Sequence, residues 1–234
     1  MRGMYLNLTD EIRNYEVKNA LLSELIKLSE EYYTLAVLKY CLPQQFAKLH
    51  KSESPDLQDE DASLGVEVTV AISPRDQQIS GESLKYSHAK TDAEREKALR
   101  KIRQNGGNRE GFITSYPVGT ADSDKKNVQN VYAKKLKKLK AYREKCSRIG
   151  IAIRMDIPLF FFEGFLDWGE WLPRTGEDDF DFVALLHWSG MDMYETKTKK
   201  YAHFRIERAD MDALNRLGRM AAEGRIKDDD PVWQ

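Results

Sequence analysis

Apolar residues near the start of the chain recur with the period of an α-helix. The repeating positions are Leu21, Leu25, Leu28, Tyr32 and Leu35. Spacings of three and four residues place all of them on one side of a helix. Thr9 suits the N-cap, and Asp10 and Glu11 would put negative charge at the positive end of the helix dipole. We predict one long helix from about residue 10 to Leu42, where Pro43 ends it.

The pattern then changes from a helical period to alternation. The segment LGVEVTVAI, residues 64–72, is rich in β-branched side chains and follows a polar turn at residues 58–63, which predicts two strands joined by a hairpin. Side chains of a strand alternate between its faces. Val66, Val68 and Val70 therefore share one face, and Gly65, Glu67, Thr69 and Ala71 share the other.

Residues 73–107 are polar and lack a continuous apolar stripe. The charged run DAEREKALRKIRQ within them favours helix, and QNGGN ends it. We interpret this stretch as a helical insertion with a solvated surface. Residues 111–118 form either a short strand or a buried loop.

A second helix is predicted at residues 127–148, with an apolar side made of Val128, Val131 or Tyr132, Leu136, Leu139 and Tyr142. The segment RIGIAIRMDI, residues 148–157, is typical of a strand. Two more strands are predicted at residues 180–188 and 200–208, followed by a closing helix at residues 209–224 in which Gly224 provides the stop. The last residues, DDDPVWQ, are expected to fray.

This order of elements is typical of an α/β protein with a central mixed sheet flanked by helices and a C-terminal strand-strand-helix extension. A length of 234 residues favours one domain, 1–234, that includes the insertion at 73–107. The hydrophobic fraction of 41% and the charged fraction of 32% are those of a globular chain.

Membrane and secretory signals are missing from the sequence. The longest nearly uncharged stretch, residues 157–166, is half as long as a membrane-spanning helix of about 20 residues. The first residues contain no apolar run before a cleavage site, so we expect a cytoplasmic protein without membrane contact.

The cysteines and histidines do not form metal-binding motifs. Cys41 and Cys146 have no CxxC partner and are expected to be buried as small apolar side chains. The histidines are His50, His88, His187 and His203. None lies four residues from another, so a histidine metal site is not expected.

Positive charge gathers in one segment although the formal net charge is only −1. Residues 125–148 contain ten lysines and arginines and one acid, Glu144, which makes +9 for this segment. Cations at this density repel one another unless anions bind nearby, so the segment is a candidate for contact with phosphates.

Asp56 and Glu67 carry the strongest chemical signal. Asp56 follows Pro55 near the end of the first hairpin strand, and Glu67 lies in the middle of the second. Two carboxylates that converge are stable mainly where a hard cation such as Mg²⁺ or Mn²⁺ binds between them. Such a metal polarises a phosphodiester and lowers the pKa of a bound water. Glu67 matters most, because a charge buried within VEVTV needs a partner.

These residues carry a family resemblance. SESPDL followed by LGVEVTVAI resembles the signature of the PD-(D/E)XK, or restriction-endonuclease-like, nuclease superfamily, in its GVEVT-type variant. The order of elements over residues 10–155 is also similar. The resemblance implies a restriction-endonuclease-like core in which Asp56, Glu67 and the carbonyl of Val68 hold the metal.

The signature departs from the family pattern at Thr69, which occupies the position of the catalytic lysine. A threonine orders a water or touches the metal, but it brings no positive charge to the transition state. The second helix offers Lys135 or Lys138 as a lysine that has migrated from the strand. The family also places an acid on the first helix, and Glu31 is the candidate at the edge of the apolar stripe, with Glu30 almost as well placed.

These features together predict a metal-dependent nuclease that hydrolyses phosphodiester bonds, with Mg²⁺ or Mn²⁺ as cofactor and DNA as the expected partner. The phosphate-contacting residues would be Lys134, Lys137, Lys138 and Lys140. The alternative, favoured by Thr69, is a catalytically inactive nuclease-fold protein of a defence or phage-derived system that binds nucleic acid or a protein partner. A third reading is an accidental match in an unrelated α/β protein. The choice of DNA or RNA, the cleavage specificity and the formation of a homodimer stay open.

Overall fold

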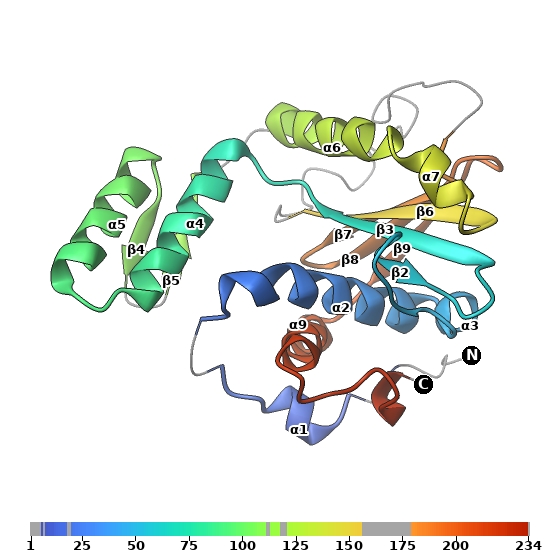
Figure 1. Ribbon diagram of the computed structural model, residues 1–234, viewed down its shortest axis with the longest axis horizontal. Helices are drawn as coiled ribbons and strands as arrows, with labels where there is room; N and C mark the ends of the chain where they lie inside the picture. The colour runs from blue at the N-terminus through green and yellow to red at the C-terminus, as the bar shows by residue number, and fades with distance from the viewer. Residues whose placement is uncertain are drawn as a thin grey trace.

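A mixed sheet of seven strands forms the centre of the protein, in the order β1-β2-β3-β6-β7-β8-β9 (Figure 1). The computed structural model describes residues 6, 8–17, 20–110, 113–117, 121–155 and 179–233. The sheet strands are β1 (His50–Lys51), β2 (Leu57–Gln58), β3 (Leu64–Val70), β6 (Arg148–Arg154), β7 (Phe182–His187), β8 (Gly190–Glu195) and β9 (Lys200–Arg205). Strands β3, β6 and β7 are parallel, whereas the outer pairs are antiparallel. The predicted α/β class with a mixed sheet is confirmed.

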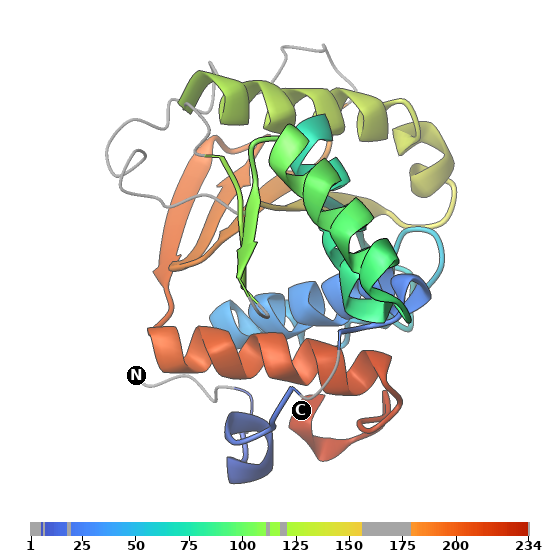
Figure 2. The same ribbon diagram turned by 90° about the vertical axis from the view of Figure 1, so that its left-hand side faces the viewer.

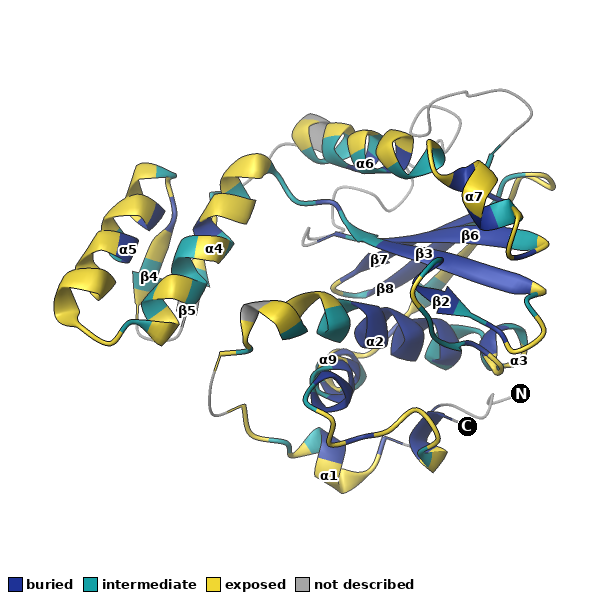
Figure 3. Ribbon diagram, in the orientation of Figure 1, coloured by how far each residue is buried: buried dark blue, intermediate teal, exposed yellow. Residues whose placement is uncertain are grey.

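Helices cover both faces of this sheet. On one face lie α6 (Ala121–Leu136) and α7 (Leu139–Arg143), and on the other lie α2 (Ser23–Cys41) and α9 (Arg208–Ala222) (Figure 1). Alternation along the strands creates the two cores: Val66 and Val68 pack toward α2 and α9, while Ile151 packs toward α6 and α7. Buried and exposed residues follow this layering (Figure 3). None of the described helices combines the length and apolarity needed to cross a membrane.

The first helix is shorter than predicted. Instead of one helix from residue 10 to Leu42, the chain forms α1 (Asp10–Arg13), capped by Thr9, and then α2 from Ser23. Tertiary contacts hold α1 against α9: Arg13 pairs with Asp210 at 2.7 Å, and its carbonyl accepts a hydrogen bond from Arg216. These contacts compete with helix continuation, which local periodicity cannot reveal. Pro43 then begins α3 (Pro43–Phe46) directly after α2.

Residues 73–107 are helical as expected. They form α4 (Pro74–His88) and α5 (Asp92–Gln104), followed by a small hairpin of β4 (Asn108–Glu110) and β5 (Ile113–Ser115). This unit projects from the side of the sheet (Figures 1 and 2). Ile79 and Ile102 are fully buried within it. The predicted segment at residues 111–118 thus contains a strand, although part of it lies outside the described residues.

The second predicted helix is interrupted. Lys137 and Lys138 form a turn between α6 and α7, and Arg148 already belongs to β6. Its predicted apolar side is nevertheless correct, because Val128, Tyr132, Leu139 and Tyr142 are all buried. The last residues predicted for the β6 strand, 156 and 157, lie outside the described part of the chain.

The C-terminal region contains one strand more than predicted. Strand β8 lies between β7 and β9, and the extension is strand-strand-strand-helix. Its sequence, GMDMYE, has no β-branched residue and begins with Gly190 at φ 152°. Pairing on both sides, from Gly190↔His187 to Glu195↔Lys200, fixes it as a strand. Strand β7 also pairs directly with β6, so the extension continues the central sheet.

The prediction that the last residues fray is wrong for Pro231–Trp233. Residues Pro231–Trp233 form a 3₁₀ turn (η2) in which the Trp233 ring is buried and stacks on Tyr32 at 5.8 Å between centroids. The Lys39 ammonium donates to the carbonyls of Trp233 at 2.8 Å and Ala47 at 2.7 Å. Burial lowers the pKa of Lys39. An aromatic anchor therefore outweighs the polar composition of DDDPVWQ.

Candidate active site

The hairpin brings Asp56 beside Glu67. Strand β2 pairs antiparallel with β3 through Leu57↔Val66 and Gln58↔Gly65, and one further step of this register places Asp56 opposite Glu67. Because β2 is only two residues long, no strand of the described residues pairs with the next part of the β3 edge on this side. Asp56 Oδ2 instead accepts a hydrogen bond from the Val68 backbone N–H at 2.9 Å. The sequence PD therefore anchors this carboxylate at the open edge of β3.

Helix α2 adds the third acid. Glu31 is buried, and its Oε1 lies 3.0 Å from Lys27 Nζ. The same ammonium lies 3.3 Å from Asp56 Oδ1, so one lysine links the two acids. Lys51 of β1 lies 2.9 Å from Glu31 Oε2. Hydrogen bonding to Glu31, with the charge of Asp56 contributing, raises the pKa of Lys27.

Helices α6 and α7 close the site from the other face of the sheet. The Lys135 ammonium forms an ion pair with Glu67 Oε1 and lies 3.5 Å from the Val68 carbonyl oxygen. Burial and the negative charge of Glu67 raise the pKa of Tyr142, and Asp56 contributes in the same direction. Both carboxylates therefore act on one phenol hydroxyl.

The electrostatics of this cluster depend on its burial. Glu31, Asp56 and Glu67 are only 3%, 3% and 4% exposed. Ionised carboxylates at such positions need partners, and Lys27, Lys51 and Lys135 provide them. Removing a lysine partner would leave the charge of a buried carboxylate uncompensated, and this effect should be smallest for Lys27, whose side chain is 75% exposed.

The candidate metal ligands are all on the same stretch of sheet edge. Asp56, Glu67 and the Val68 carbonyl offer oxygen atoms, which Mg²⁺ and Mn²⁺ prefer. The ammonium of Lys135 contacts two of these three groups. Among the described residues, no three carboxylates bring ligand atoms within 4.8 Å of one another. The joint role of Asp56 and Glu67 as metal ligands stays a prediction.

The other predicted residues are placed as follows. Thr69 is half-buried and lies two residues beyond Glu67 on β3, and hence on the same face. Of the two candidate lysines, Lys135 reaches the carboxylate of Glu67, whereas Lys138 is exposed. The lysines at 134, 137, 138 and 140 are all exposed. Glu30 pairs instead with Arg154 at 2.6 Å.

A second cluster of ionisable groups was missed by sequence reasoning. His187, Asp192 and His203 offer ligand atoms that lie within 4.8 Å of one another. They come from β7, β8 and β9, and pairing of Asp192 with His203 across β8 and β9 creates the contact. Burial lowers the pKa of His187 to about 4. The expectation that no histidine metal site forms considered helical spacing alone, which does not reveal side chains that converge across paired strands.

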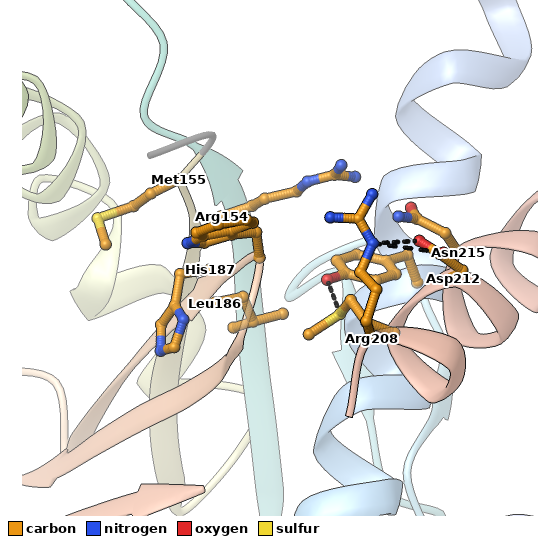
Figure 4. A pocket seen from close by; sticks show the side chains of 10 residues that line it. Arg154, Met155, Leu186, His187, Arg208, Asp212 and Asn215 are labelled. Carbon is orange, nitrogen blue, oxygen red and sulfur yellow. Dashed lines mark hydrogen bonds and ion pairs between the residues drawn. The ribbon is translucent and has the colours of Figure 1, made fainter. Parts of the chain in front are cut away.

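A small pocket of about 110 Å³ lies between the ends of β6 and β7 and helix α9, apart from the carboxylate site, and His187 is one of its lining residues (Figure 4). Arg154 and Arg208 line it, and Arg208 is 3.2 Å from Asp212. None of the predicted site residues belongs to its lining. In Figure 4 the imidazole of His187 points away from Arg208 and Asp212.

Sequence and structure comparisons give no independent indication of a family. Comparison with protein-family models, with curated proteins and with solved structures found no match.

Proposed function

We propose that this protein is a metal-dependent nuclease that hydrolyses phosphodiester bonds, with DNA as its substrate. The observation that best supports this proposal is the position of Lys135. Its ammonium contacts Glu67 and the Val68 carbonyl beside Asp56. A restriction-endonuclease-like site needs a cation and two carboxylates at one strand edge, and Lys135 supplies from α6 the charge that Thr69 lacks.

Asp56, Glu67 and the Val68 carbonyl would hold Mg²⁺ or Mn²⁺. A bound metal would polarise the phosphodiester and lower the pKa of a water. Lys135 would then give up its pairing with Glu67 and direct its ammonium to the scissile phosphate, where charge develops. Glu31 keeps Lys27 next to Asp56 and thereby positions that carboxylate.

The outer side of α6 and α7 would contact the nucleic-acid backbone. The exposed residues on this side are Lys134, Lys137, Lys138 and Lys140. Binding through them would be insensitive to sequence, because lysines at phosphates read no base edges.

One observation favours the alternative of a catalytically inactive nuclease-fold protein. Each of the three buried acids already has a lysine partner within the protein, so the cluster is neutralised without a metal. Such a protein would bind nucleic acid or a protein partner and cleave nothing. A single measurement distinguishes the two proposals.

That measurement is metal-dependent cleavage by the wild-type protein. Supercoiled plasmid DNA incubated with the protein and Mg²⁺ or Mn²⁺ is expected to be nicked or linearised, and a chelator should stop the reaction. An RNA of similar length in parallel reports on substrate class. Intact plasmid with both metals, under conditions where the DNA is bound, would replace the nuclease proposal with the inactive alternative.

The lysines of α6, of α7 and of the turn between them should separate into those that bind DNA and one that acts in cleavage. Replacing Lys134, Lys137 or Lys140 by alanine should weaken DNA binding to a similar extent for all sequences and lower the salt slope by about one unit each. Lys135→Ala should instead lower the cleavage rate while most affinity is kept, because its charge acts in the transition state.

Filter binding across a salt series, with single-turnover cleavage of the same DNA, measures both quantities. Equal losses of affinity and rate in all four variants would assign the whole segment to docking. Unchanged binding in the three outer variants would show that the outer lysines do not contact DNA.

A further inference from the structure

The sheet carries a second group of candidate ligands, separate from the carboxylate site. Asp192 of β8 is flanked by His187 of β7 and His203 of β9. Asp192 pairs with His203 across one strand boundary and with Leu185 across the other, and His187 lies two residues beyond Leu185. All three side chains therefore share one face of the sheet.

The ring of His187 contains a buried nitrogen that is not satisfied by the part of the chain that the structure describes. The side chain is fully buried, and its Nε2 has no hydrogen-bond partner among the described residues. That nitrogen lies 3.6 Å from Asp192 Oδ2, which is too long for a hydrogen bond. Two ligands of a tetrahedral zinc, each about 2.0–2.1 Å from the metal, lie roughly 3.4 Å apart. The spacing thus suits two ligands of one cation better than a direct contact.

We propose that His187 Nε2, an Asp192 carboxylate oxygen and a ring nitrogen of His203 form a binding site for a transition-metal dication of the Zn²⁺ class. Two imidazoles and one carboxylate favour such metals over Mg²⁺, which prefers oxygen ligands. The carboxylate site on β3 has only oxygen donors, so the two sites select different cations.

Neighbouring groups contact each of the three ligands. Ser189 approaches His187 Nδ1 with its backbone N–H, which donates at 3.3 Å, and with its hydroxyl oxygen at 3.2 Å. Metal binding at Nε2 would require the ring proton to lie on Nδ1, where the Ser189 hydroxyl oxygen would accept it. Tyr201 donates to Asp192 Oδ1 at 2.5 Å. His203 Nδ1 lies 2.7 Å from the same oxygen, and metal binding would replace the hydrogen bond between them.

The site is accessible from one side. The His203 side chain is 37% exposed, whereas those of His187 and Asp192 are 0% and 2% exposed. A cation can therefore enter past His203. The half-exposed position also makes His203 the ligand whose replacement disturbs packing least.

The test is a Co²⁺ titration of the chelator-treated full chain, followed by visible absorption, with Zn²⁺ competition. The titration is run in excess Mg²⁺, which would occupy the carboxylate site, and we expect one equivalent of Co²⁺ to bind under these conditions and Zn²⁺ to displace it. His203→Ala and Asp192→Asn should each weaken binding by about 100-fold or more, since even groups that only orient ligands contribute about 10–100-fold. The matched control is His88→Ala, whose histidine is exposed on α4.

A second readout protects against misfolded variants. Zn²⁺ should raise the melting temperature of the wild type and of His88→Ala, but not that of His203→Ala. If circular dichroism shows that His203→Ala is unfolded, His203→Gln replaces it. Glu67→Gln should bind Co²⁺ like the wild type, which separates this site from the nuclease site. The proposal is overturned if the wild type binds no Co²⁺, if both ligand variants bind normally, or if only Glu67→Gln loses binding.

Discussion

Replacing Glu67 by glutamine is expected to abolish the metal-dependent cleavage of plasmid DNA, with a loss of about 10³-fold or more. The metal supplies several kcal/mol of transition-state stabilisation, and each 1.36 kcal/mol corresponds to a factor of about ten. Glutamine keeps the size of the side chain on β3 but removes the charge that would hold the cation. Single-turnover cleavage with Mg²⁺ and with Mn²⁺ measures this loss.

The matched control is Glu24→Gln on α2, because Glu24 is exposed, whereas Glu67 is buried. Its activity should equal that of the wild type. Glu67→Gln leaves the Lys135 ammonium unpaired, so its melting temperature must be compared as well. The double variant Glu67→Gln with Lys135→Met removes both charges and should recover stability without activity. Wild-type cleavage by a folded Glu67→Gln protein would exclude Glu67 as a metal ligand.

Replacing Gly218 by alanine is expected to destabilise the protein, although alanine is the better helix former. A Cβ at Gly218 would lie 2.6 Å from Tyr33 N, 2.8 Å from Tyr33 Cα and 2.9 Å from Ser29 O. These are backbone atoms of α2, which cannot rotate away, so the two helices must separate. Overpacking of this kind costs about 3 kcal/mol and outweighs the ~1 kcal/mol gained in helix propensity. The melting temperature should fall by about 4–8 °C.

Gly81 provides the comparison within the same chain. It lies in α4, and a Cβ there would meet no atom of the described residues within 4 Å. Gly81→Ala should therefore stabilise its helix by about 0.5–1 kcal/mol. Chemical denaturation of both variants tests the argument. A Gly218→Ala protein as stable as the wild type would show that α2 and α9 can separate at little cost.

Local patterns in the sequence determined most elements and one hairpin. The β-branched alternation around Glu67 predicted β3 and its buried acid, since burial on a sheet requires this period. The apolar side of residues 127–148 predicted which face of α6 and α7 is buried. The same local signals predicted that Lys134, Lys137 and Lys140 are exposed.

Long-range contacts decided the rest, because their partners are distant in sequence. Contacts of α1 with α9 shortened the first helix, and packing of Trp233 on Tyr32 ordered the chain end. Pairing on both edges made β8 a strand despite its composition.

The candidate site divides in the same way. Sequence identified Asp56 and Glu67 from their local pattern, and it offered two lysines without distinguishing between them. Only the packing of α6 on the sheet selected Lys135. The rotation of a helix about its axis is fixed by all of its buried side chains together, and these contact residues that are distant in sequence. The approach of His187 to His203 likewise depends on strand register, which a helical spacing rule does not contain. The order of residues determines which chemical groups lie near one another along the chain. Which side chains converge from distant segments is determined by the packing and register of the folded sheet.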